Sequence, residues 1–338
     1  MKGLVGFAIA AVVVGVVGCN TGSTTFGLPP HVVYYTVYFG GSPSPPALEA
    51  ITAPVTGSNV PFAILSNSSG TGLSEAYNVA TDSAGRLFAV NFNAGAPPNT
   101  VSAFNPPVTS TSSAAFILTL TGITGAFGIS FDASGNMWIC GNSGNKMQEY
   151  VGPFTGNANI TPAITLTNNL NFPEGAAFDA AGNLYVANEG VSIGTAAITI
   201  FLKGSGFTNG QLSRVTLDGA IRPEGIAVDA AGNLYAGSEN IGIVRWNAAT
   251  VAAAIAGPTS GATPDVTDGT GMGASAFPSQ LTFDGAGNLY DGDCGGVGGF
   301  GVYEWPTATQ AFTSTLAPVK FVDANITTSG CVGGIAVH

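Results

Sequence analysis

The sequence predicts an all-β fold: a six-bladed β-propeller of four-stranded antiparallel blades. The first observation is composition, because 45% of the 338 residues are hydrophobic, only 8% are charged and 49 are glycines. This composition excludes a disordered chain and a coiled coil, and it suits short strands joined by tight turns. The second observation is a unit of roughly fifty residues that recurs along the chain. The third is that the last segment of the chain matches only the beginning of that unit.

The first eighteen residues have the pattern of a targeting signal. Lys2 precedes an apolar run from Gly3 to Val17, which is shorter than the ~20 residues that span a bilayer and fits a secretory signal. The run ends in Val-Val-Gly-Cys, which resembles a bacterial lipobox, so we predict cleavage after residue 18 and lipidation of Cys19. An uncleaved membrane anchor is the alternative. Residues 19–30 would then form a polar tether, and residues 31–338 a folded domain outside the cytoplasm.

Five repeats share a strand, a D-x-x-G-N or D-x-x-G-R turn, and a second strand. The aspartate of such a turn can accept backbone N–H bonds, and its glycine can adopt the positive φ that closes the turn. A catalytic residue has no reason to recur in every repeat, so we assign these aspartates to the turns. They are Asp82, Asp132, Asp179, Asp229 and Asp284.

Two further strands should complete each blade. After Asp179 they read AAITIFLKG and LSRVTLDG, and after Asp229 they read GIVRWNA and VAAAIAG. The chain ends with VGGIAVH, a first strand without its continuation, and the missing strands match HVVYYTVYFG, ALEAITAP and PFAILSN near the N-terminus. A sixth blade built from both ends would leave no open sheet edge. Three tryptophans fall inside strands, where packing between blades is expected: Trp138, Trp246 and Trp305.

The repeat resembles that of the NHL-repeat propellers, P-x-G-[IV]-A-V-D-x-x-G-N-[LI]-Y-V. Residues 223–235, PEGIAVDAAGNLY, match nearly every position, and residues 173–185 match almost as well. The resemblance spans the folded part of the chain and implies a six-bladed propeller. It implies no single activity, because relatives of this architecture include binding modules, lactonases and lyases.

Acidic side chains should gather at one end of the channel. Consecutive strands run antiparallel, so the residue after P in P-E-G and the end of the second strand share one face of the propeller. This places six acids of three consecutive blades together: Glu174, Glu189, Glu224, Glu239, Asp291 and Asp293. The other half of the same face should carry Tyr77, Phe92 and Phe127.

Two interpretations of the acidic half remain open. Divalent cations such as calcium bind several carboxylate and carbonyl oxygens, and Asn188 or Asn240 could add neutral ligands; gluconolactonase-like propellers hold a metal near the channel. The alternative is a solvated acidic rim in a chain of net charge −11. His31 and His338 fall in the closing blade, and His338 takes the position of the turn aspartate, at the opposite face, which disfavours a histidine-dependent lyase.

The sequence therefore favours a membrane-anchored, monomeric module that binds a protein or a glycan without catalysis. The alternative is a metal-dependent hydrolase resembling gluconolactonases, with Glu174 or Glu224 as ligand or base. The excess of acidic residues argues against a nucleic-acid partner. Export permits disulfides, and Cys294 and Cys331 should lie on one face of neighbouring blades, so we predict a bond between them and a free Cys140.

Overall fold

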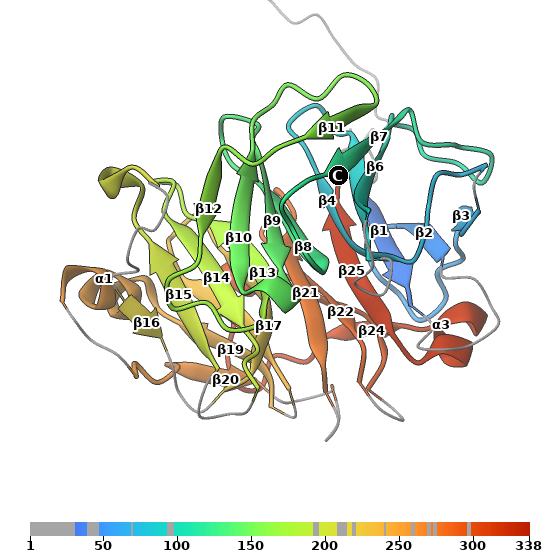
Figure 1. The fold of residues 1–338 in the computed structure, drawn as a ribbon. Coiled ribbons are helices and arrows are strands. Elements are labelled where there is room, and N and C mark those ends of the chain that lie inside the picture. The colour runs from blue at the N-terminus through green and yellow to red at the C-terminus, as the bar shows by residue number, and fades with distance from the viewer. Residues whose placement is uncertain are drawn as a thin grey trace, which may run out of the picture. The chain divides into compact units, whose positions relative to one another are not determined.

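Six β-sheets surround a central channel in the computed structural model, and the first strand of each repeat lies innermost (Figure 1). The residues described by the structure are 31–38, 47–68, 70–92, 98–191, 196–207, 215–217, 221–239, 241–257, 261–268, 272, 276–295 and 299–338. The predicted signal and tether, with Cys19, lie outside them. No helix in the described ranges is both long and apolar enough to cross a membrane.

Each blade begins with its inner strand, and the chain then runs outward. The first three blades along the chain consist of β4 (Ala76–Thr81), β5 (Leu87–Asn91), β6 (Asn99–Phe104) and β7 (Phe116–Leu120); β8 (Ala126–Phe131), β9 (Met137–Gly141), β10 (Lys146–Tyr150) and β12 (Ile164–Leu166); and β13 (Pro173–Phe178), β14 (Leu184–Asn188), β15 (Ala197–Phe201) and β16 (Val215–Leu217). One addition was not predicted: β11 (Ala158–Ile160) pairs in parallel with β7, so that blade has a fifth strand.

The next two blades and the closing blade follow the same order. They consist of β17 (Pro223–Val228), β18 (Leu234–Ser238), β19 (Gly242–Trp246) and β20 (Val266–Asp268); β21 (Pro278–Phe283), β22 (Leu289–Asp293), β23 (Gly301–Trp305) and β24 (Val319–Phe321); and β25 (Val332–Val337), β1 (Val32–Val37), β2 (Ala47–Thr52) and β3 (Ala63–Ser66). The helical elements are η2 (Asn142–Gly144), η4 (Lys203–Ser205), α1 (Ala248–Ala256), α2 (Ala308–Ala311) and α3 (Ala324–Ser329).

The predicted closure of the ring by both ends of the chain is confirmed. Strand β25 pairs antiparallel with β1, with Ile335 opposite Tyr35, and Figure 1 shows the red C-terminal strand beside the blue N-terminal one. Val32 and His338 extend this pairing, because the backbone N–H of each donates a hydrogen bond to the carbonyl of the other. The closure places the two strands in one blade, with β25 as its inner strand and β1 paired on both of its edges.

The predicted fourth strand VAAAIAG is wrong. Those residues lie mostly in helix α1, and the fourth strand of that blade is β20, further along the chain. The segment from Ala248 to Ala256 contains six alanines, and alanine has the highest helix propensity of all residues. Helix α1 buries Val251 and Ala254, so the segment still contributes apolar side chains to the core.

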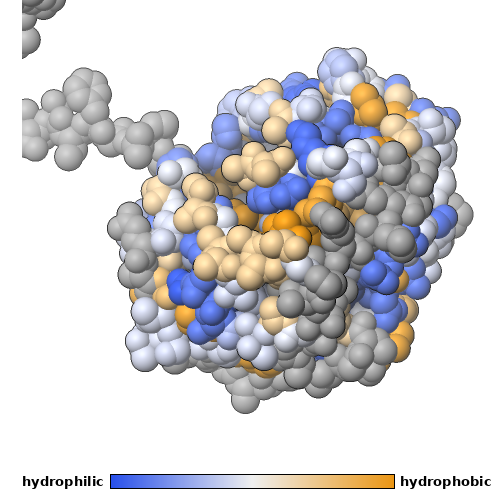
Figure 2. Space-filling model, turned by 90° about the vertical axis from the view of Figure 1, so that its left-hand side faces the viewer, coloured by the Kyte–Doolittle hydropathy of each residue, from blue (hydrophilic) through white to orange (hydrophobic). Residues whose placement is uncertain are grey.

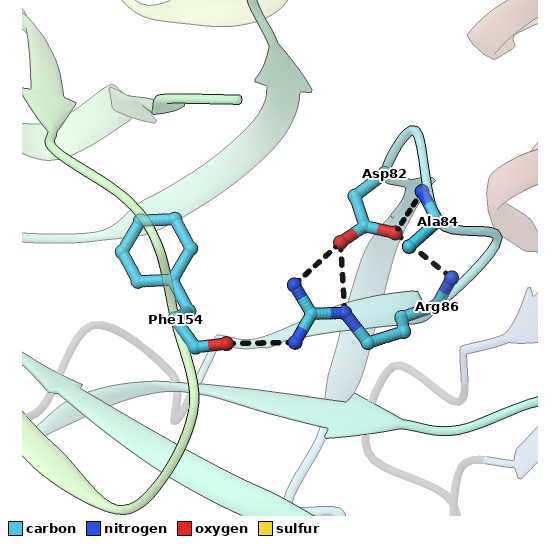
Figure 3. A network of polar contacts seen from close by, with 4 residues as sticks. All are labelled: Asp82, Ala84, Arg86 and Phe154. Atoms are coloured by element: carbon cyan, nitrogen blue, oxygen red, sulfur yellow. Dashed lines mark hydrogen bonds and ion pairs between the residues drawn. The ribbon is translucent and has the colours of Figure 1, made fainter. Parts of the chain in front are cut away.

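The five repeated aspartates are turn residues, as predicted. In every repeat, the aspartate Oδ1 accepts the backbone N–H of the residue four positions later, and Oδ2 accepts that residue's side chain. Figure 3 shows the arginine version of this turn, in which Arg86 Nε donates to Asp82 Oδ2 at 2.8 Å. The same guanidinium donates to the carbonyl of Phe154 at 2.7 Å, which ties this turn to the next blade.

The predicted packing role of the tryptophans is also confirmed. All three side chains are fully buried: Trp138, Trp246 and Trp305. Their indole nitrogens donate hydrogen bonds to Asp132, to the carbonyl of Ala262 and to Asp268, respectively. These residues therefore belong to the core.

The inner strands approach one another so closely that the channel narrows midway. A Cβ atom on Gly128 would collide with the carbonyl oxygen of Glu174, and one on Gly175 would collide with that of Glu224. Gln280 crosses the remaining space, donating to the Val79 carbonyl at 2.7 Å and accepting from the Ile335 amide at 2.7 Å. The constriction separates the end that carries the aspartate turns, here called the turn end, from the opposite end.

Candidate functional site

A β-bulge interrupts the pairing near the start of each inner strand that opens a full repeat. The register shifts within the first residues of β4, β8, β13, β17 and β21. A bulge redirects the side chain of the extra residue. The redirected residues form what we call the channel mouth, at the end opposite the turns: Tyr77, Phe127, Glu174, Glu224 and Ser279.

The side chains of the channel mouth come together although they belong to different blades. Tyr77 shares a side-chain hydrogen bond with Ser279. Burial raises the pKa of the Tyr77 phenol well above its ordinary value, and the negative charges of Glu174 and Glu224 raise it further. Tyr77 and Ser279 lie on inner strands that are separated by the closing blade, so the bond between them places both side chains toward the channel. All five residues of the mouth are buried.

Glu174 is a buried carboxyl group with a single hydrogen-bond partner among the described residues. Asn142 Nδ2 donates to its Oε1 at 2.6 Å. Burial raises the pKa of Glu174 to about 8, although the Arg222 charge and the Asn142 bond both act to lower it. The neutral form therefore persists near neutral pH.

Glu224 is the least satisfied group of the mouth. Its side chain is 1% exposed, and neither carboxyl oxygen has a hydrogen-bond partner in the described part of the chain. Burial raises the pKa of Glu224 well above its usual range, and the charges of Glu174, Glu239 and Asp293 raise it further, while Arg222 opposes them. A buried carboxyl group without a partner is costly to keep, so this position is suited to a ligand that supplies one.

Arg222 forms the solvent side of the mouth. Its guanidinium group makes ion pairs with Glu189 and with Glu239, which follow the second strands of two adjacent blades. The three side chains are 18–24% exposed, in contrast to the buried glutamates below them. Arg222 thus neutralises much of the outer acidic charge, and the described residues give the inner glutamates no cation of their own.

The remaining two predicted acids lie on strand β22. Asp293 accepts the backbone N–H groups of Phe277 and Gly295, and burial raises its pKa to about 7 despite these bonds and the Lys320 charge. Asp291 is fully buried and has no hydrogen-bond partner among the described residues. Its pKa is raised well above the ordinary value by burial and by the charge of Asp293. Four of the six predicted acids are therefore buried, which does not fit a solvated rim.

The acids do not form a ready-made metal site. Within the described ranges, no three His, Cys, Asp or Glu side chains are arranged to hold one metal ion. Arg222 engages Glu189 and Glu239, and backbone amides engage Asp293. The candidate ligand Asn188 is bonded to Asn171, Thr199 and two backbone carbonyls, and Asn240 lies outside the described residues. The calcium site stays a prediction.

The aromatic half of the face is present as predicted. The ring centroids of Tyr77 and Phe127 lie 4.0 Å apart, and Phe92 packs 5.6 Å from Phe127. Tyr38 joins them at 5.1 Å from Tyr77. The sequence pattern did not single out Tyr38, which follows β1, the second strand of the closing blade, in YYTVYFG; its only signal is that position.

The cysteines and histidines occupy the places that the repeat pattern indicates. The structure pairs Cys294 with Cys331 and leaves Cys140 free and buried. That this disulfide forms in the exported protein stays a prediction. His338 lies beside Gly85, at the turn end and not at the mouth.

The turn end also holds a cavity of about 300 Å³ lined by the inner strands, mostly with apolar residues such as Phe131 and Phe283. A space-filling view shows a hollowed face on which hydrophobic and hydrophilic residues meet (Figure 2).

Comparisons with known proteins support the fold. A family model described as strictosidine synthase-like, N-terminal, matches residues 210–246. A protein of unknown function from Bacteroides caccae has 12% identity and a TM-score of 0.59, covering 91% of this chain and 99% of its own. A catalytically inactive virginiamycin B lyase from Staphylococcus aureus has 12% identity and a TM-score of 0.50, covering 85% and 84%.

A gluconolactonase from Xanthomonas campestris has 14% identity and a TM-score of 0.49, covering 78% of this chain and 83% of its own. A search of curated proteins finds no match. At identities this low, the structural similarity shows a six-bladed propeller and no shared activity. The resemblance to NHL repeats stays an expectation.

Proposed function

We propose that this protein is an extracytoplasmic binding module, anchored through Cys19, whose channel mouth takes part of a protein or glycan partner. The observation that carries the proposal is Glu224, a buried carboxyl group at the bulge of its inner strand, with both oxygens unused among the described residues. Binding explains the mouth better than catalysis, because the described residues there include no histidine and no nucleophile paired with a base. The turn-end cavity is lined by no charged side chain and so offers a charged ligand group no partner.

Binding can be tested with arrays of short peptides and oligosaccharides probed with the purified, detergent-solubilised protein. We expect a subset of probes to bind, and Phe127→Ala to weaken that binding at least tenfold. Phe131→Ala is the matched control, because it removes the same side chain from the turn end of the same strand. Binding lost equally in both variants, or no probe bound at all, would contradict the proposal.

The anchor gives a separate prediction. Cys19→Ser removes the thiol that would receive the lipid, so the protein should leave the membrane fraction or accumulate with its signal uncleaved. More than one acyl chain is needed to hold a protein stably on a bilayer, and Cys19 is the site where we expect them. Cell fractionation and electrophoretic mobility measure the effect. A variant that fractionates and migrates as the wild type does would show that the chain is not a lipoprotein.

A further inference from the structure

The channel mouth combines two features that a single ligand group can satisfy. One side presents Glu174 and Glu224, and the other presents the packed rings of Tyr77 and Phe127. Carboxylates attract cations, and the faces of aromatic rings attract them as well. All four residues occupy the bulge near the start of an inner strand, so the two sides border the same end of one channel.

We propose that the ligand group bound at the mouth is an organic cation, an ammonium or guanidinium, held between Glu224 and the rings of Tyr77 and Phe127. This inference rests on the proposed binding function and names the chemistry that the site selects. The ligand reaches the mouth from the side of Arg222, Glu189 and Glu239, which are the partly exposed groups beside it.

The charge balance supports a positive ligand group. Arg222 acts on the charges of Glu174 and Glu224, but its guanidinium group is paired with the two outer carboxylates, Glu189 and Glu239. Glu174 receives one hydrogen bond from an uncharged amide, and Glu224 receives none from the described residues. A guanidinium or ammonium group would supply hydrogen-bond donors to both carboxyl groups and the positive charge that stabilises their ionised forms.

The same geometry disfavours a metal ion as the occupant. Calcium takes about six to eight oxygen ligands at close range. No three acidic groups of the described residues are arranged for that, and the aromatic half offers rings where a metal would need oxygens. An organic cation can place donors on one side and its flat or methylene surface on the other.

Binding should release a proton. Glu224 is surrounded by Glu174, Glu239, Asp293, Arg222 and the Tyr77 phenol, and the net effect keeps its carboxyl group protonated in the free protein. A cation stabilises the ionised form, so the affinity should rise with pH. A neutral ligand would show no such dependence.

Butylguanidinium and its uncharged analogue butylurea provide the test, measured by calorimetry on the full-length protein at pH 6 and pH 8. We expect wild type to bind butylguanidinium at least tenfold more tightly than butylurea. The dissociation constant for butylguanidinium should be lower at pH 8 than at pH 6. Glu224→Gln, which keeps the size of the side chain, should abolish the preference. Glu49→Gln should keep it, because Glu49 is a buried glutamate of the closing blade that Tyr35 and Asn325 already engage.

Equal affinities for the two compounds in wild type, or a preference that survives in Glu224→Gln, would overturn the inference. A rise in melting temperature with calcium chloride alone would instead assign the site to a metal ion. If array binding still depends on Phe127 while butylguanidinium shows no preference, the binding function stands and only the cation is wrong. If both fail, the mouth is not a ligand site.

Discussion

Raising the pH from about 5 to about 8 is expected to lower the free energy of unfolding of the wild-type protein. In the folded state, burial raises the pKa of Glu174 to about 8 and that of Asp293 to about 7, and it raises those of Glu224 and Asp291 well above their ordinary values. In the unfolded chain, these groups ionise near pH 4. Between these pH values unfolding releases protons, so a rising pH favours the unfolded chain until the folded-state groups ionise as well.

Asp291→Ala should reduce this loss of stability and raise the free energy of unfolding at pH 8 by about 1–3 kcal/mol, because it removes a buried carboxyl group that lacks a partner. The corresponding positions of the other full blades, each opposite the matching inner-strand residue, are apolar: Ala89, Ile139, Val186 and Ala236. The alanine therefore fits a site of this shape.

Urea unfolding at pH 5 and pH 8 measures both effects. A wild-type stability that does not fall between the two pH values would contradict the pH prediction. An Asp291→Ala variant that is less stable than wild type at pH 8 would show that the carboxyl group has a stabilising partner.

The fold was predictable because the repeat specifies it several times over. The D-x-x-G-N turn and the strands around it recur five times, and the match between the last strand and the missing blade determines the closure. The one wrong strand, VAAAIAG, lies where the repeat is weakest and where helix propensity is high. A local preference prevailed where no repeated pattern opposed it.

The candidate site was predictable in its residues but not in its environment. Antiparallel strand direction alone places the acids and the aromatics at one end, and Glu174, Glu224, Tyr77 and Phe127 meet there. A sequence pattern does not reveal the bulges that aim these side chains at the axis, because any residue type can occupy them. Burial was missed for the same reason: it depends on how six blades close around the channel, whereas a run of acids in isolation suggests solvent.

The strongest effect on the fold should come from the predicted disulfide. Cys331→Ser is expected to lower the free energy of unfolding of the exported protein by about 3–4 kcal/mol, because the bond closes a loop with a sequence separation of 37 residues and restricts the unfolded chain. The bond joins the end of β22, next to Asp293, to the residue before β25, and so fastens the last full blade to the closing blade.

Urea unfolding with and without a reductant measures the contribution of the disulfide: the reductant should destabilise wild type and leave Cys331→Ser unchanged. Peptide mapping of the unfolded, unreduced protein should find Cys140 as a free thiol and a linked Cys294–Cys331 peptide. Free thiols at Cys294 and Cys331 would rule the bond out, and the closure would then rest on the pairing of β25 with β1 and on the packing of Val332 and Ile335 against Tyr290 and Val302.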